Sequence, residues 1–176
     1  MVQVACGADH NVFLTDQGKV FCSGQNFNYQ LGNGTIIDNA SPNLMHQMEQ
    51  LNVTKICCGS SFSCALTDTG NVIMWGTLRH GDKYGTLVLS EPAVVKPLKR
   101  VNIIDIASGG AHVLALGSDG TLYTWGYVQY NKTHIKITFN KFKSSFNSAK
   151  FPLNGSCSYL RAFVIYSLIA ILCLDD

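Results

Sequence analysis

The same pattern of residues occurs three times in this chain. The copies occupy residues 4–24 (VACGADHNVFLTDQGKVFCSG), 56–76 (ICCGSSFSCALTDTGNVIMWG) and 106–126 (IASGGAHVLALGSDGTLYTWG). Aligned copies share glycines at three positions, occupied by Gly7, Gly59 and Gly109, by Gly18, Gly70 and Gly120, and by Gly24, Gly76 and Gly126. Repetition at about fifty residues is typical of solenoids and propellers, in which each unit packs only against its neighbours.

Each copy predicts three short antiparallel β-strands. A first apolar run ends at Gly7 or its equivalents, and a second run follows at residues 11–15, 63–67 and 113–117. The second run stops at a turn containing Asp and Gly, which is typical of a hairpin. A third run then leads to another glycine. Because no stretch of the repeats keeps a helical period over three turns, we expect an all-β fold.

The repeat resembles that of the regulator of chromosome condensation family. The residues at the motif positions of the first copy are Gly7, His10, Leu14, Thr15, Asp16, Gly18, Val20, Gly24, Asn26, Gln30, Leu31 and Gly32. Trp75 and Trp125 supply the motif tryptophan that Ser23 replaces, and His112 shares the position of His10. The resemblance implies a partial seven-bladed β-propeller, with two complete blades, part of a third and a non-repeat C-terminal tail.

The repeats divide the chain into four parts. They are a first repeat at 1–51, a second at 52–101, a partial third at 102–126 and a tail at 127–176. The outer strand of the first blade is expected at Asn43 to Met48, just after Pro42, because a sheet edge tolerates the missing N–H of proline. From Tyr127 onward the motif residues are lost, so we expect no proper continuation of the third blade there.

The end of the tail is strongly apolar. Residues 159–174 (YLRAFVIYSLIAILCL) form a run shorter than the about 20 residues needed to span a membrane. Three interpretations stay open: a non-repeat end produced by truncation or alternative splicing, a marginal tail anchor, or a helix covering the open edge of the ring. Its length argues against the anchor.

Composition indicates a strand-rich protein without a metal or cofactor site. The net charge of +2 is too small by itself to indicate nucleic-acid binding. The seven cysteines form no C-x-x-C pair and have no histidine at ligand spacing, which argues against structural zinc. Four of them, Cys6, Cys57, Cys58 and Cys64, fall at strand positions, and we expect small buried thiols in a reducing compartment. Because the chain begins directly with a strand, we expect no signal peptide and a nuclear or cytoplasmic location.

The histidines of the repeat have a structural interpretation. Phe62 replaces His10 and His112 in the second copy. An exchange with an aromatic residue favours packing over catalysis, since a repeated residue serves the repeated fold. The sequence holds no nucleophile elbow and no phosphate-binding glycine loop, so it predicts a binding protein and not an enzyme.

The resemblance implies the partners of the full-length parent. They are a small GTPase, Ran, whose nucleotide release the propeller promotes, and histones or chromatin; no small-molecule substrate and no membrane is expected. Such exchange works by holding the nucleotide-free GTPase more tightly than the bound one. Two alternatives stay open: a generic interaction segment of a larger protein, such as a ubiquitin ligase or kinase, and an inactive truncated product.

The candidate partner contacts lie in the second blade. Residues 75–79 (WGTLR) are similar to the Trp-Gly-Ser-Phe-Arg stretch that opens a protruding β-wedge in the exchange factor of this family. The candidates are therefore Leu78, Arg79, His80, Gly81, Asp82 and Lys83. An ordinary solvated loop is the alternative. Acidic residues soon after the repeat-opening glycine face the GTPase in that factor, and Asp9 is the acidic residue so placed here.

Overall fold

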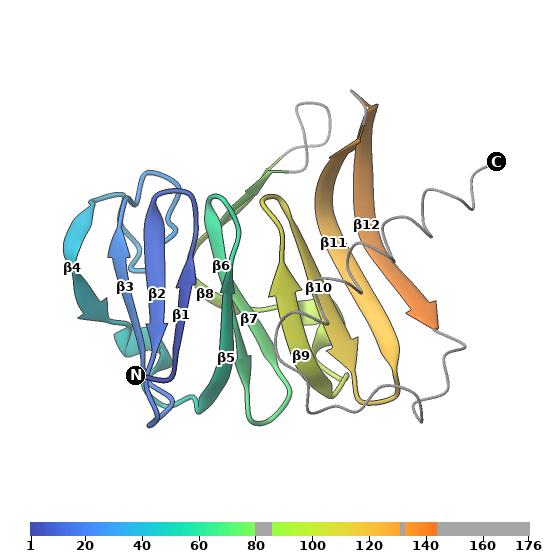
Figure 1. Cartoon of the computed structure of the whole chain (residues 1–176), viewed down its shortest axis with the longest axis horizontal. Coiled ribbons are helices and arrows are strands. Elements are labelled where there is room, and N and C mark those ends of the chain that lie inside the picture. Colours follow the sequence, from blue (N-terminus) through green and yellow to red (C-terminus); the bar gives the residue numbers. More distant parts are fainter. Residues whose placement is uncertain (80–85, 131–132, 144–176) are drawn as a thin grey trace.

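Three four-stranded antiparallel sheets, or blades, follow one another along the chain in the computed structural model, which describes residues 1–79, 86–130 and 133–143 (Figure 1). The first blade holds β1 (Gln3–Cys6), β2 (His10–Leu14), β3 (Val20–Gly24) and β4 (Asn39–Leu44). The second holds β5 (Val53–Cys58), β6 (Phe62–Thr67), β7 (Val72–Arg79) and β8 (Thr86–Val94). The third holds β9 (Ile103–Ser108), β10 (His112–Gly117), β11 (Thr121–Tyr130) and β12 (Thr133–Lys143). The predicted all-β, partial-propeller fold is confirmed.

Within each blade the strands pair in sequence order. The first strands of successive blades lie next to each other, β1 against β5 and β5 against β9. A short 3-10 helix, His46–Met48 or Lys96–Leu98, leads from the outer strand of one blade towards the next. Each repeat is therefore one meander that packs face to face on its neighbour.

The first glycine of each repeat lies beneath an aromatic ring. A Cβ on Gly7 or Gly109 would stand 2.0 or 2.2 Å from the imidazole of His10 or His112, and one on Gly59 would stand 2.0 Å from the ring of Phe62. The three glycines are thus in equivalent positions, as the sequence predicts. Close approach of the ring explains the glycine, and it also explains why histidine and phenylalanine exchange here.

Two apolar cores lie between the blades. The core between the first and second blades includes Val12, Leu14, Ile56 and Trp75. The core between the second and third includes Leu66, Met74, Ile106 and Trp125. β6 is buried along its whole length because it contributes to both cores. The second blade is therefore the centre of the described molecule.

The structure differs from two sequence-based expectations about strands. The outer strand of the first blade is Asn39–Leu44, with Pro42 inside it, and His46–Met48 is a 3-10 helix. The third sheet does not stop at residue 126: β11 continues to Tyr130, and β12 pairs with it along its length. β12 thus supplies a fourth strand from the segment expected to be a non-repeat tail, although it lacks the motif residues.

Within the described ranges, no helix has the length and apolar character needed to cross a membrane. The apolar run at 159–174 lies outside these ranges.

Candidate protein-binding surface at the loop end

The first hairpin turns of all three blades meet at one end of the molecule, here called the loop end (Figure 1). The N–H of Ala8 donates to the carbonyl of Ser60 at 3.3 Å, and the N–H of Ser60 donates to the carbonyl of Gly110 at 2.8 Å. These bonds use only main-chain atoms. They hold the three turns side by side whatever side chains the turns carry.

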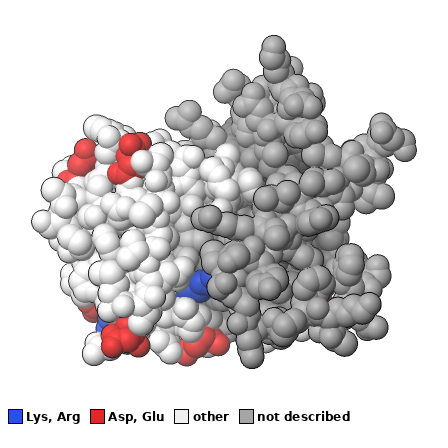
Figure 2. All heavy atoms as spheres, in the orientation of Figure 1, with Lys and Arg blue, Asp and Glu red and all other residues white. Residues whose placement is uncertain are grey.

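Two carboxylates lie at the loop end of the first blade. Asp9 is exposed, and its carbonyl accepts a hydrogen bond of 2.8 Å from the N–H of Gln25. Asp38 is exposed as well, and its Oδ1 accepts a hydrogen bond of 2.8 Å from the N–H of Asn26, which follows Gln25 in the chain. Figure 2 shows acidic side chains at this upper end of the first blade, and others at the lower end of the molecule. Asp38 was not a sequence candidate, because only the folded β3–β4 loop brings it to this end.

The end of the second blade projects beyond its hairpin turn. Phe62, the first residue of β6, pairs with Gly76, and β7 then continues for three residues to Arg79, which pairs with Thr86 of β8. Leu78 does not face outward: it is completely buried in the core shared with the third blade. Its role is packing, because the neighbouring blade covers it. His80, Gly81, Asp82 and Lys83 lie outside the described residues.

A buried hydrogen-bond chain connects the first and second blades just beneath the loop end. The carbonyl of Gln30 accepts bonds from Trp75 Nε1 at 2.8 Å and from Ser63 Oγ at 3.3 Å. His10 Nε2 lies 2.8 Å from Ser63 Oγ. Since the Ser63 hydroxyl donates its hydrogen to Gln30, His10 donates through Nε2. His10 and Trp75 therefore have structural roles in the contact between blades.

Burial keeps His10 neutral. The loss of solvent lowers the pKa of His10 to about 4, against a smaller opposite effect of Asp9. Burial also lowers the pKa of His112, whose Nε2 has no hydrogen-bond partner among the described residues. His10 is buried and His112 is half-buried, and each imidazole packs on the first glycine of its own repeat.

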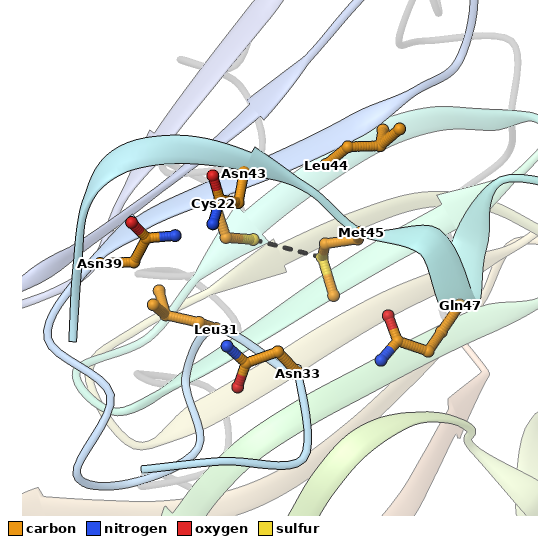
Figure 3. Close-up of a pocket in the computed structure, with 8 residues that line it drawn as sticks. All are labelled: Cys22, Leu31, Asn33, Asn39, Asn43, Leu44, Met45 and Gln47. Carbon is orange, nitrogen blue, oxygen red and sulfur yellow. Dashed lines mark hydrogen bonds between the residues drawn. The ribbon is translucent and has the colours of Figure 1, made fainter. Parts of the chain in front are cut away.

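A small pocket lies in the first blade between the β3–β4 loop and β4 (Figure 3). The Cys22 thiol lies 3.2 Å from the sulfur of Met45 at its wall, and burial raises the pKa of Cys22. The lining residues are Cys22, Leu31, Asn33, Asn39, Asn43, Leu44, Met45 and Gln47. This lining offers amides and apolar groups but no carboxylate or ammonium. Among the described residues no group of three His, Cys, Asp or Glu side chains could hold a metal ion.

Sequence comparison identifies the repeat. Two profiles of the family described as "Regulator of chromosome condensation (RCC1) repeat" match, one at residues 17–66 and the other at residues 1–30, 53–81 and 103–131. Together they cover more than half of the chain. The chain belongs to the RCC1 repeat family. The second profile matches once in each blade, in agreement with the three sheets.

Several RCC1-family proteins are similar to parts of this chain. The mitochondrial RCC1 domain-containing protein RUG3 of Arabidopsis thaliana is 36% identical over 81 residues, which is 46% of this chain and 18% of RUG3. The human E3 ubiquitin-protein ligase HERC2 is 43% identical over 67 residues, which is 38% of this chain and 1% of HERC2. The matches therefore span only a small part of these relatives.

Solved RCC1 propellers share the fold. Yeast RCC1 (Prp20) bound to Kap60 superimposes with a TM-score of 0.57 at 30% identity, over 72% of this chain and 30% of Prp20. Prp20p of Saccharomyces cerevisiae, described with its binding to Gsp1p and histones, superimposes with a TM-score of 0.65 at 17% identity, over 84% of this chain and 39% of that one. These RCC1 structures support the interpretation of the three sheets as propeller blades.

Proposed function

We propose that this chain is a protein-binding RCC1 propeller segment whose loop end contacts a small GTPase of the Ran type and promotes nucleotide release. The observation that carries this proposal is the position of Asp9. It is exposed at the end where the three turns meet, and Asp38 adds a second exposed carboxylate at the same end of the first blade. Exposed carboxylates held at one end of the fold fit a basic surface on a protein partner.

The chemistry needed for exchange is differential binding. A propeller that contacts the nucleotide-free GTPase more strongly than the loaded one shifts the equilibrium towards release, and it supplies no acid, base or nucleophile. Arg79 belongs to the same proposal, because β7 carries it beyond the turn of its blade. Histones are a second basic partner for the same carboxylates. A nuclear or cytoplasmic location accompanies the proposal.

The diversity of the relatives favours a second candidate. The identity with HERC2, at 43%, lies in a segment that makes up 1% of that ligase. A segment of this kind can act as an interaction module within a larger protein, with a partner that is not a GTPase. The two candidates share the loop end as the binding surface and differ in the partner.

Release of a fluorescent guanine nucleotide from Ran, measured with the full chain, tests the proposal. We expect the chain to accelerate release, and Asp9→Asn and Arg79→Ala each to weaken the interaction by about 1–3 kcal/mol if they are anchor contacts. Asp16→Asn is the matched control, because Asp16 is an exposed carboxylate in the β2–β3 turn. Binding of histones to the same variants is measured in parallel.

Two results would contradict the proposal. Unchanged nucleotide release in the presence of the folded chain would reject the exchange activity. Equal losses for Asp9→Asn and Asp16→Asn would reject the loop end as the contact surface.

A further inference from the structure

Cys57 and Cys64 face each other across two neighbouring strands. They are direct Cα partners in the antiparallel pair of β5 and β6. Directly opposite residues in such a pair have Cα atoms about 4.5–5.5 Å apart, and a disulfide requires about 4.4–6.8 Å. The two side chains also lie on the same face of the sheet, because opposite residues do. The backbone is therefore already in place for a bond between the two sulfurs.

The two thiols differ in how far they are buried. Cys64 is completely buried in the core between the second and third blades, whereas Cys57 is half-buried at the edge of that core. A small oxidant can reach Cys57 more readily than Cys64. One thiol is thus placed to react first and the other to react with the product.

The side chains around Cys57 favour its thiolate. A hydrogen bond from the Cys64 thiol lowers the pKa of Cys57, and the Ser108 hydroxyl and the Lys55 ammonium lower it further. Burial and the Asp105 carboxylate oppose these effects, and the net shift is downward. Lys55 is held in place by an ion pair with Asp105 of β9. Burial raises the pKa of Cys64. Reactivity of cysteine follows thiolate character, so Cys57 is the nucleophile of the pair.

We propose that Cys57 is an oxidation site for a hydroperoxide and that Cys64 resolves the product to a reversible disulfide. The Cys57 thiolate attacks one oxygen of hydrogen peroxide and the O–O bond breaks. The hydroxide that leaves takes up the proton lost earlier by the Cys57 thiol and becomes water, while Cys57 becomes a sulfenic acid. Cys64 sulfur then attacks Cys57 sulfur, the S–O bond breaks, and the hydroxyl leaves as water with the Cys64 proton. Two thiols and one peroxide give one disulfide and two waters.

The other described cysteines lack this arrangement. Cys58 is opposite Ser63, and burial raises the pKa of Cys58 to about 12. Cys22 is opposite Val12, and Cys6 is opposite Asn11. Cys6 is exposed and is the main competitor for an oxidant.

The proposed bond would close a ring around the β5–β6 turn, which carries Ser60 at the centre of the loop end.

Peptide mapping of the full chain tests the proposal. The reduced chain is treated with hydrogen peroxide, alkylated and digested with trypsin. Cleavage after Lys55 and Arg79 leaves Cys57, Cys58 and Cys64 in one peptide, residues 56–79. We expect this peptide to take up one alkyl group where the reduced form takes up three, and to be lighter by two hydrogens before alkylation. Dithiothreitol should restore full alkylation.

Cysteine variants identify the bond. Cys58→Ser should keep the disulfide, because Cys58 is not part of the proposed bond. Only Cys57 and Cys64 then remain in the peptide, so a disulfide within it must join these two. Cys64→Ala should lose it and leave a Cys57 sulfenic acid that dimedone labels, and Cys6→Ser is the matched control that should change nothing at Cys57. If Cys64→Ala does not fold, the Cys58→Ser result decides alone.

Three outcomes would overturn the proposal. One is a fully alkylated Cys58→Ser peptide at a peroxide dose that oxidises Cys6. Another is a disulfide that needs Cys58 or Cys6. The third is a cross-linked species joining residues 56–79 to Cys157 or Cys173, which lie outside the described residues.

Discussion

The buried imidazole of His10 makes the contact between the first two blades sensitive to pH. Its pKa is lowered to about 4 from 6.5 by burial. Between these values the unfolded chain binds a proton at this site and the folded chain does not. The free energy of unfolding should therefore fall as the pH drops from about 6.5 to about 4, by at most about 3 kcal/mol from this residue.

His10→Phe tests that dependence with the residue that the second blade uses at the same position. We expect urea unfolding of the variant to show a weaker loss of stability between pH 6.5 and 4 than the parent, because phenylalanine takes up no proton. The remaining loss would include that from His112, whose pKa is also lowered by burial. Identical pH profiles for the two proteins would contradict the role assigned to His10.

Substitution of Gly76 and Gly120 by alanine distinguishes the cost of a left-handed backbone conformation from the cost of a steric clash. Both adopt left-handed φ, 91° and 78°. A Cβ on Gly76 would lie 2.6 Å from the carbonyl oxygen of Ser61, whereas one on Gly120 would meet nothing within 4 Å. Gly120→Ala should cost about 1 kcal/mol of stability from conformation alone, and Gly76→Ala should cost clearly more. Equal losses in denaturant unfolding would show that crowding at Gly76 is relieved without cost.

At the scale of elements, the loop between β3 and β4 makes hydrogen bonds from the first blade to the second. Asn26 is fully buried and organises this loop: its Nδ2 donates to Asn33 Oδ1 at 2.9 Å and to the Thr35 carbonyl at 2.8 Å, and its Oδ1 accepts from the Leu31 N–H at 2.9 Å. The loop then presents the Gln30 carbonyl to Trp75. One side chain thus sets the geometry of a contact between blades.

Asn26→Ala should therefore weaken the whole contact between the blades. The variant leaves the Leu31 N–H without its acceptor inside the protein, and an unsatisfied buried group costs about 1–3 kcal/mol. We expect a loss of that size in urea unfolding, together with a shift in tryptophan fluorescence. Asn28→Ala is the control, because Asn28 holds Thr77 through its main-chain carbonyl. Equal losses in both variants would contradict the role of Asn26.

Sequence reasoning predicted those elements whose residues carry a local signal. Repeated glycines and Asp-Gly turns located the first three strands of each blade. The outer strand β4 was misplaced because its sequence, NASPNL, is polar and mostly exposed, so it has no apolar alternation. β12 carries no residue of the repeat motif, so the motif does not predict it; its local signal is the alternation of Ile135 and Ile137 with Lys136 and Thr138.

The candidate site was harder to predict, because a surface depends on contacts between distant segments. Exposure of Asp9 agrees with its proposed role. The family resemblance indicates Leu78 as a partner contact, whereas the structure buries it in the core shared with the third blade. Asp38 reaches Asn26 only through the folded β3–β4 loop, so no spacing in the sequence indicates it.

At the scale of the whole molecule, stability should decrease from the central blade outward. β6 is buried at all six positions, while four of the six residues of β4 are exposed. Amide hydrogens exchange most slowly where opening requires loss of the most packing. Hydrogen exchange followed by mass spectrometry should therefore show the slowest exchange in β6 and fast exchange in β4. Equal protection in both strands would contradict this gradient.

The main-chain bonds between the hairpin turns also have an evolutionary consequence. The three linked positions are occupied by Ala8, Ser60 and Gly110, which have no side-chain chemistry in common. Selection can change these residues and their exposed neighbours without disturbing the ladder that joins the blades. A lineage can thus exchange one partner for another while keeping the same scaffold, and a protein engineer can randomise the same positions to obtain new binding specificities.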